Sequence, residues 1–152
     1  MERATTPGKI QKRFQRVVDQ AIQLRTERRY DEALKLLRDL FLEPVFPISP
    51  NRLRRAYALA MTCADKLSAW SALEALAREA IERVPEPSHA YYRLGEALMR
   101  QDRLADAEAA LQTAIELNPA EQEAPMLLQL CRSRSQAPSK RPRVAPWPGR
   151  QT

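Results

Sequence analysis

Apolar residues recur at helical spacing through most of this chain of 152 residues, with polar residues between them. The segment ERRYDEALKLLRDLFL is typical, because Ala33, Leu34, Leu37 and Leu40 fall on one side of a helix. No stretch alternates apolar and polar residues as a half-buried strand would. Ala, Leu, Arg, Glu and Gln dominate the composition, and these residues favour helices. The pattern therefore predicts an all-α protein.

Capping residues and prolines predict where the helices begin and end. Ser49 and Pro50 suit the N-cap and the first position of a helix, and Asp31 and Ser68 are further candidate N-caps. Prolines in the segment EPVFPISP and at Pro85 end the helices that precede them. These signals predict seven helices, over residues 10–26, 31–42, 50–66, 68–84, 88–101, 102–117 and 121–133.

The stretch YYRLGEALMRQDRLADAEAALQTAIELNP, residues 91–119, has small and apolar residues at intervals that no single amphipathic helix requires. Its last residue, Pro119, lies 34 positions after Pro85. A helix–turn–helix unit of this length buries small residues where its two helices cross. The residues expected to make this packing are Tyr91, Leu94, Gly95, Leu98, Ala107, Leu111, Ala114 and Pro119.

This spacing resembles the tetratricopeptide repeat, whose helical hairpins stack into an α-solenoid. The resemblance implies three units, about 14–47, 54–87 and 88–121, and a capping helix over 121–133. Met61 stands where the second unit should have Gly, and its second helix fits best with a one-residue shift that places Ala72 and Leu76 in conserved slots. About six extra residues, 48–53, separate the first two units.

The chain divides into one folded domain and two ends. The repeat resemblance implies a domain over residues 10–134. Residues 1–9 and the Pro-rich, basic segment 135–152 have no helical periodicity, and such a composition cannot bury enough apolar surface to order itself. We therefore expect both ends to be disordered.

In the tetratricopeptide family the first helix of each hairpin lines a concave groove that binds a peptide or a partner helix. The resemblance implies a groove that is apolar on one side and charged at its rim, suited to an amphipathic helix or an apolar segment. Aromatic and arginine side chains anchor many interfaces, whereas the aliphatic residues could equally pack between helices. The implied groove residues are Val18, Ile22, Arg55, Leu59, Thr62, His89, Tyr92, Arg93, Glu96 and Arg100, with Gln15, Asp19, Arg25, Thr26, Ala58, Asp65, Lys66 and Met99 at further groove-facing positions.

Some members of this family bind the C-terminus of a chaperone and hold its carboxylate with Lys, Asn and Arg side chains. The corresponding residues here are Val18, Ile22, Leu59, His89 and Arg93. Only Arg93 matches, and without the other donors a carboxylate loses most of its charge-assisted hydrogen bonds. The sequence therefore argues against a chaperone cofactor of this kind.

The sequence contains no recognisable catalytic or metal-binding motif. A hydrolytic or transfer site needs a nucleophile, a base and a polarising group within reach of one another. The chain has a single histidine, His89, no glycine-rich phosphate loop, and two distant cysteines, Cys63 and Cys131. We therefore expect no enzymatic activity, no metal and no cofactor, with His89 exposed or in the groove and both cysteines reduced and packed between helices.

The formal net charge of +6 belongs to the ends of the chain. From residue 132 onward there are six Lys or Arg residues and no acidic residue, so the remainder is neutral overall. That argues against a nucleic-acid site on the folded body, because phosphate binding needs clustered cations on a fixed surface. Lys140, Arg141 and Arg143 resemble a short nuclear import signal, with a solvated tail or contact with an anionic partner as alternatives.

The sequence favours a non-catalytic protein-binding module, an adaptor or assembly factor whose partner is a peptide or an amphipathic helix. Three alternatives stay open: a dedicated chaperone similar to the class II type III secretion chaperones, binding of nucleic acid or an acidic partner through the basic termini, and self-association through the end of the solenoid. Residues 1–18 lack the apolar core of a signal peptide, and no run of about 18 apolar residues occurs. We therefore expect a cytoplasmic protein outside the membrane, with the nucleus as the alternative.

Overall fold

The computed structural model describes residues 6–43 and 48–137, and this part of the chain is all-α, as the apolar periodicity predicts. No helix in these ranges has the length and apolar character needed to cross a membrane. The helices are α1 (Pro7–Thr26), α2 (Tyr30–Leu42), α3 (Pro50–Lys66), α4 (Trp70–Arg83), α5 (Ser88–Arg100), α6 (Leu104–Leu117) and α7 (Glu123–Gln136).

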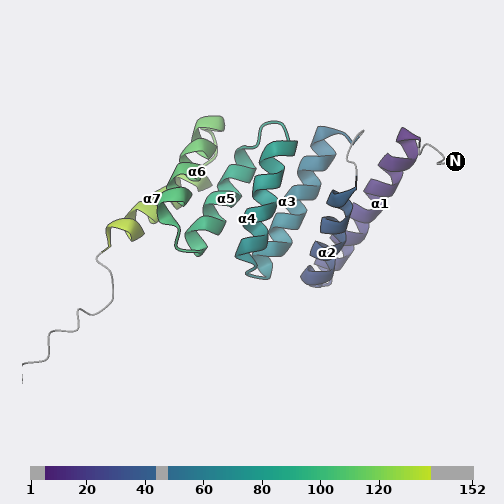
Figure 1. Cartoon of the computed structure of the whole chain (residues 1–152), viewed down its shortest axis with the longest axis horizontal. Coiled ribbons are helices and arrows are strands. Elements are labelled where there is room, and N and C mark those ends of the chain that lie inside the picture. The colour runs from purple at the N-terminus through teal and green to yellow at the C-terminus, as the bar shows by residue number, and fades with distance from the viewer. Residues whose placement is uncertain (1–5, 44–47, 138–152) are drawn as a thin grey trace, which may run out of the picture.

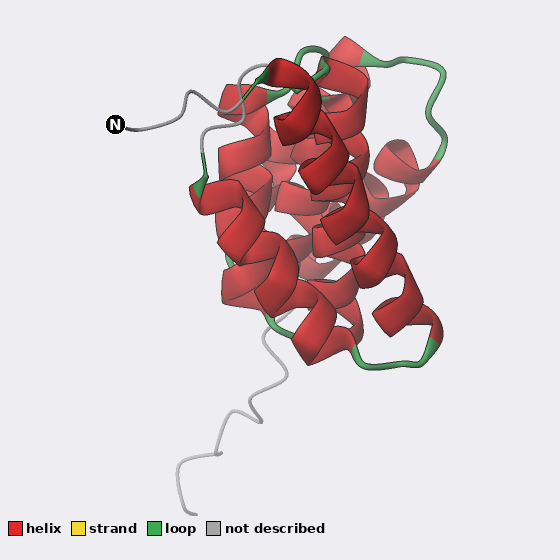
Figure 2. Ribbon diagram, turned by 90° about the vertical axis from the view of Figure 1, so that its right-hand side faces the viewer, coloured by secondary structure: helices red, strands yellow, loops and turns green. Residues whose placement is uncertain are grey.

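The helices pair in chain order into hairpins, and the hairpins stack into an α-solenoid (Figure 1). The α1–α2 hairpin forms one end, α3–α4 and α5–α6 follow, and α7 packs against α6 at the other end. Figure 2 looks along this stack from the side of α1. Each hairpin contacts its neighbours in the stack, so the core is a continuous row of helix–helix contacts rather than a central cluster.

The turns inside the hairpins repeat the same backbone conformation. Arg28, Ser68 and Asp102 all have a positive φ, between 53° and 61°. Ser68 and Asp102 lie 34 residues apart, the repeat length that the prolines indicate, whereas Arg28 and Ser68 lie 40 apart. Most of the additional residues between the first two units lengthen α3, which begins at Pro50, four positions before the counterpart of the first residue of α5.

The constant spacing of 34 residues corrects the predicted register of the second unit. Both helices of the second hairpin begin and end in step with those of the third, apart from the start of α3. The one-residue shift is therefore wrong, and Ala72 is only partly buried. Without the shift, the positions of Ala107, Leu111 and Ala114 correspond to the buried residues Leu73, Ala77 and Ala80.

The predicted helix starts are partly correct. Ser49 caps α3, with its hydroxyl accepting a hydrogen bond from the Arg52 backbone N–H at 3.4 Å. The N-caps predicted at Asp31 and Ser68 are wrong, because the positive-φ turns place Arg29 and Ala69 at the N-cap of α2 and α4. At the ends of the folded part, α1 begins at Pro7 rather than at residue 10, and α7 runs from Glu123 to Gln136 rather than over 121–133.

The third hairpin is the most closely packed because of Gly95 on α5. A Cβ atom at Gly95 would lie 2.5 Å from Cγ of Leu111 and 3.4 Å from the carbonyl oxygen of Ala107, both on α6. Of the predicted packing residues Tyr91 is partly buried and Pro119, which follows α6, is exposed. The other packing residues are buried, namely Leu94, Gly95, Leu98, Ala107, Leu111 and Ala114.

The first and second hairpins are joined by an aromatic pair and one arginine. The rings of Phe41 on α2 and Tyr57 on α3 stack with centroids 4.0 Å apart. Arg83 at the end of α4 donates to the carbonyl oxygen of Phe41 at 2.9 Å and to the hydroxyl of Tyr57 at 3.1 Å. Burial raises the pKa of the Tyr57 phenol, which therefore stays protonated at neutral pH.

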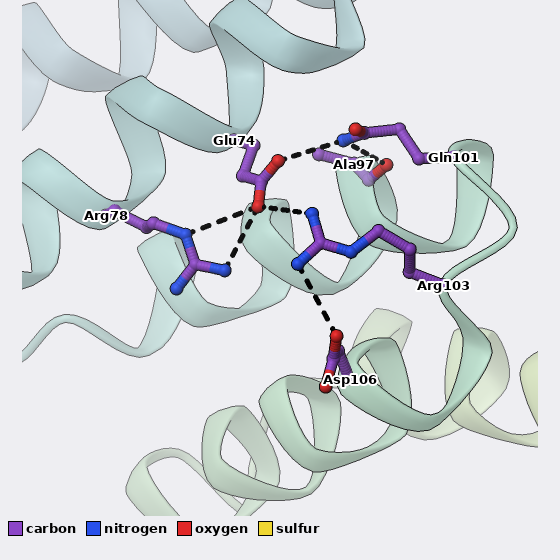
Figure 3. A network of polar contacts seen from close by, with 6 residues as sticks. All are labelled: Glu74, Arg78, Ala97, Gln101, Arg103 and Asp106. Carbon is purple, nitrogen blue, oxygen red and sulfur yellow. Dashed lines mark hydrogen bonds and ion pairs between the residues drawn. The ribbon is translucent and has the colours of Figure 1, made fainter.

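A polar network centred on Glu74 of α4 joins the second and third hairpins (Figure 3). The carboxylate of Glu74 accepts hydrogen bonds from Arg78 at 3.0 Å, from Arg103 at 2.8 Å and from Gln101 at 3.2 Å. Arg103 also pairs with Asp106 at 3.4 Å. Burial opposes ionisation of Glu74, but the three donors outweigh it and lower the pKa of the carboxyl group.

Candidate partner-binding groove

A cleft of about 670 Å³ lies between α1 and α3, the first helices of the first two hairpins. Val18 and Leu59 are buried in its lining, whereas the Ile22 side chain is 39% exposed. Burying an isoleucine side chain fully stabilises a fold by about 1.5–3 kcal/mol. The partly exposed Ile22 contributes only a part of that stabilisation. The lining comprises Phe14, Gln15, Val18, Ile22, Arg25, Arg52, Arg55 and Leu59.

The cleft has a basic rim, formed by Arg25 of α1 and by Arg52 and Arg55 of α3. All three side chains are exposed. Within residues 6–43 and 48–137, none of these guanidinium groups forms an ion pair or a side-chain hydrogen bond. The apolar lining and the unpaired cations therefore lie side by side in one cavity.

A second group of groove residues lies on α5, around Tyr92. The ring of His89 lies 6.1 Å from that of Tyr92, and the guanidinium of Arg93 lies 5.9 Å from the Tyr92 centroid. Arg93 forms an ion pair with Glu96 at 2.8 Å, and its contact with Asp65 of α3 is 3.8 Å long. Arg93 is therefore neutralised within the groove, unlike the three arginines at the other end.

Acidic residues surround Tyr92. Burial raises the pKa of its phenol, and the nearby carboxylates of Glu96, Glu123 and Glu121 raise it further. Burial and then the neighbouring Glu123 also raise the pKa of the Glu121 carboxyl. This end of the groove is therefore acidic, whereas the cleft between α1 and α3 is basic.

His89 lies in this acidic region but is held neutral. Burial and then the neighbouring Arg93 lower the pKa of its imidazole, and Glu123 only partly opposes them. His89 is partly buried, and it lines a small cavity with Tyr57 and Met61 of α3 as well as facing Tyr92.

The predicted groove residues thus fall into two groups with two exceptions. The structure gathers Val18, Ile22, Arg55 and Leu59 around the cleft, and His89, Tyr92, Arg93 and Glu96 on α5. Thr62 donates its hydroxyl to the Ala58 carbonyl of its own helix at 2.9 Å. Arg100 lies over the ring of Trp70 on α4, 5.2 Å from its centroid, and so contacts the second hairpin's outer helix.

Two residues of the cleft were not among the predicted groove residues, Phe14 and Arg52. Phe14 belongs to the apolar stripe of α1, which by itself indicates only core packing. Arg52 lies in the segment between the predicted units. The Ser49–Pro50 signal could have located it, because a helix beginning at Pro50 places Arg52 one turn before Arg55 on the same face.

Neither cysteine has the environment of a reactive thiol. Burial raises the pKa of both thiols, at Cys63 and Cys131, which disfavours the nucleophilic thiolate. Cys131 donates to the Leu104 carbonyl at 3.3 Å. In the described part of the chain no group of three or more His, Cys, Asp or Glu side chains is placed to hold a metal ion. The tail residues Lys140, Arg141 and Arg143 lie outside the described residues.

The fold and the groove place this chain among the α-solenoids built from helical hairpins. Residues 71–121 match the family model of the tetratricopeptide repeat, and this range covers nearly all of α4 and the whole of the third hairpin. This part of the chain is therefore similar in sequence to the tetratricopeptide repeat, and it includes residues 91–119, whose spacing indicates the same family. No curated protein matches it in sequence.

Solved tetratricopeptide structures have the same fold. The first repeat domain of Spaghetti (RPAP3), bound to the HSP90 peptide SRMEEVD, superposes with a TM-score of 0.71 at 17% identity, covering 84% of this chain and 96% of that one. The tetratricopeptide domain of OM64 from Arabidopsis superposes with a TM-score of 0.68 at 14% sequence identity, and the match covers 82% of this chain and 98% of that one. Cns1, an Hsp90 co-chaperone from Saccharomyces cerevisiae, superposes with a TM-score of 0.71 at 20% sequence identity, and the match covers 87% of this chain and 41% of Cns1.

Proposed function

We propose that this chain is a non-catalytic protein-binding module, an adaptor or assembly factor, whose groove holds an apolar segment or an amphipathic helix of a partner protein. The observation that carries the proposal is the cleft between α1 and α3, where the partly exposed Ile22 lies among arginines that have no partner in the described structure. An amphipathic segment would cover the apolar lining and pair with the cations at once.

The structural neighbours support a protein partner. The repeat domains of Spaghetti and human RPAP3 have been solved with HSP90 and HSP70 peptides. Their likeness to this chain is one of fold, and the residues that would hold a terminal carboxylate are different here. Val18, Ile22, Leu59 and His89 offer no fixed cation, and Arg93 is already paired with Glu96 at 2.8 Å. We therefore propose a partner segment other than a chaperone C-terminus.

The proposal is tested by co-purification from a native lysate with matched baits. Ile22→Glu places a charge in the cleft, and Leu67→Glu places the same charge on a leucine that is also 39% exposed but lines a different surface depression, beside α2. A third bait ends after Ala137, which keeps α7 intact and removes the basic tail. Circular dichroism confirms that all baits are folded.

The groove proposal expects a protein that is retained by the unaltered chain, by Leu67→Glu and by the shortened bait, and lost with Ile22→Glu. Loss of all partners on removing the tail, with Ile22→Glu without effect, would instead place binding in residues 138–152. A single client held in a one-to-one complex would favour the dedicated chaperone over an adaptor, because an adaptor joins more than one protein.

A further inference from the structure

The chemistry of the two ends of the groove differs, and this difference bears on the kind of partner. We propose that the cleft between α1 and α3 recognises an apolar segment flanked at one end by acidic side chains, which pair with Arg25, Arg52 and Arg55. The inference deepens the proposed function, because it rests on the groove being the binding site and adds the charge pattern of the segment.

The arginines are available for pairing. Arg25 extends from the last turns of α1, and Arg52 and Arg55 lie one turn apart on α3, so cations border the cleft from both helices. Several exposed arginines elsewhere are paired within the chain, as Arg13 is with Glu43 at 2.7 Å and Arg132 with Glu108 at 2.9 Å. A carboxylate offers each free guanidinium two acceptor oxygens in a matching plane.

The apolar lining argues for a protein partner over a nucleic acid. The cleft interleaves its cations with Phe14, Val18, Ile22 and Leu59, which a phosphate backbone has no means of covering. The Phe14 ring is only 4% exposed, so it is not a platform on which a base could stack. A segment that carries both aliphatic and carboxylate side chains covers both components of the lining.

The acidic end of the groove limits where the partner's acidic residues can lie. Glu96, Glu121 and Glu123 surround Tyr92 on the side of α5 and α7, and Arg93 beside it is already paired with Glu96 at 2.8 Å. A uniformly acidic segment would form favourable ion pairs with the arginines of the cleft, but the glutamates around Tyr92 would repel it. The partner's acidic side chains are therefore confined to the end of the segment that lies against α1 and α3.

The test uses short synthetic peptides with a common apolar core and fluorescence anisotropy with the full chain. Because the direction of binding is open, glutamates are placed at the N-terminal end in one peptide and at the C-terminal end in another. Each has a glutamine and a lysine counterpart. All are acetylated and amidated, so that only side-chain carboxylates are presented, and one further copy of each glutamate peptide has a free C-terminus.

Two variants of equal charge change separate the arginine pairing from general electrostatics. The cleft variant is Arg25→Gln/Arg52→Gln/Arg55→Gln. The control variant is Arg16→Gln/Lys35→Gln/Arg38→Gln, which removes three exposed cations that lie outside the cleft lining. Both sets are at exposed positions, and circular dichroism and melting curves confirm that the folds remain intact.

The proposal expects one amidated glutamate peptide to bind roughly tenfold more tightly than its glutamine counterpart, as several partly exposed ion pairs together would provide. The preference should disappear in the cleft variant and persist in the control variant. It should also shrink as the salt concentration rises, because exposed pairs are screened. The lysine counterpart should bind more weakly than the glutamine peptide.

Other outcomes contradict the inference in distinguishable ways. Equal binding of the glutamate and glutamine peptides, abolished by Ile22→Glu, would keep the groove as the binding site and overturn the acidic preference. Binding only of the peptide with a free C-terminus would replace it with recognition of a terminal carboxylate, and displacement by a single-stranded oligonucleotide would replace it with a nucleic-acid site. If no peptide binds, the inference fails, and the lysate experiment decides separately whether the groove proposal stands.

Discussion

Gly95 shows how a single residue sets the distance between two helices. A side chain at this position would collide with Leu111, which is fully buried and held by α6, so the methyl group has no space to enter. The second hairpin has Met61 in the equivalent place, buried at 2% exposure, so its helices meet through a larger side chain. The first hairpin has the small and fully buried Ala21 in this place, so the size of the residue differs from one hairpin to the next.

Gly95→Ala is expected to destabilise the chain. Alanine improves the helical propensity by about 1 kcal/mol, but forcing a methyl group to within 2.5 Å of Leu111 Cγ costs more, typically 1–3 kcal/mol. We expect a net loss of up to about 2 kcal/mol in chemical denaturation. The matched control is Gly8→Ala at the start of α1, where nothing lies within 4 Å and a small gain is expected. Equal effects of the two substitutions would disprove the packing argument.

A second residue-scale prediction concerns Arg28 in the turn of the first hairpin. Its φ of 60° costs most L-residues about 1–2 kcal/mol, whereas asparagine adopts this conformation more easily. Its exposed side chain forms no ion pair in the described part of the chain. We expect Arg28→Asn to raise the free energy of unfolding by about 0.5 kcal/mol.

The control for Arg28 is Arg38→Asn, which makes the same chemical change at an exposed position within α2. Asparagine is a poorer helix former than arginine, so this variant should lose stability. Thermal melts of both variants provide the comparison, and a loss at Arg28 as large as that at Arg38 would contradict the role given to the turn.

At the scale of elements, the junctions between hairpins are built differently. The first and second hairpins meet through the stacked rings of Phe41 and Tyr57 with Arg83 across them. The second and third meet through the Glu74 network, which depends on an ionised carboxylate. The two junctions should therefore respond differently to pH.

Acidification is expected to weaken the Glu74 junction. The pKa of Glu74 is lowered in the folded chain from its ordinary value of 4.5, so its ionised form stabilises the fold above that value. This contribution is lost as the pH falls from 4.5 through the lowered folded-state pKa. Glu74→Gln should reduce the free energy of unfolding by about 1–3 kcal/mol at neutral pH. On acidification this variant should lose less stability than the unaltered chain.

The comparison is a series of urea titrations between neutral and acidic pH for the unaltered chain, Glu74→Gln and Glu82→Gln. Glu82 is exposed and near the end of α4, and its substitution should leave the acid dependence unchanged. A parallel loss of stability in all three proteins would show that the acid sensitivity arises elsewhere.

The sequence predicts whole elements better than their connections. The apolar stripes, Ser49–Pro50 and the spacing around Gly95 are local signals, and they identify the hairpins and the ends of most helices. The N-caps at Asp31 and Ser68 are wrong because the positive φ of the turns determines where the next helix begins. Local residue preferences do not contain this information, since the turn follows from how the two helices pack.

The groove residues were predictable only from their places in the repeat. Position within the unit identifies Val18, Ile22, Arg55 and Leu59 around the cleft. It does not predict that Arg100 lies on Trp70, nor that Arg93 is paired with Glu96. Such pairings depend on side chains from other helices, and they decide which cations remain free for a partner.

For the molecule as a whole, we propose that the partner lies in the groove along α1, α3 and α5. The solenoid exposes separate surfaces that a partner could use instead. A depression beside α2 is lined by Leu34, Lys35 and Leu67, and α7 exposes Met126 and Leu130 on its outer side. Binding data alone do not distinguish these surfaces, because a substitution can act at a distance.

The most direct measurement is photo-crosslinking from defined positions. A photoreactive benzoylphenylalanine is placed at Ile22 in the cleft, at Leu67 beside α2, or at Met126 on α7, and the adducts with the co-purified partner are mapped by mass spectrometry. If the partner lies in the groove, adducts are expected from the position of Ile22, joined to a partner segment with acidic residues beside aliphatic ones. Adducts from Leu67 or Met126 with none from Ile22 would contradict this proposal and move the interface out of the groove.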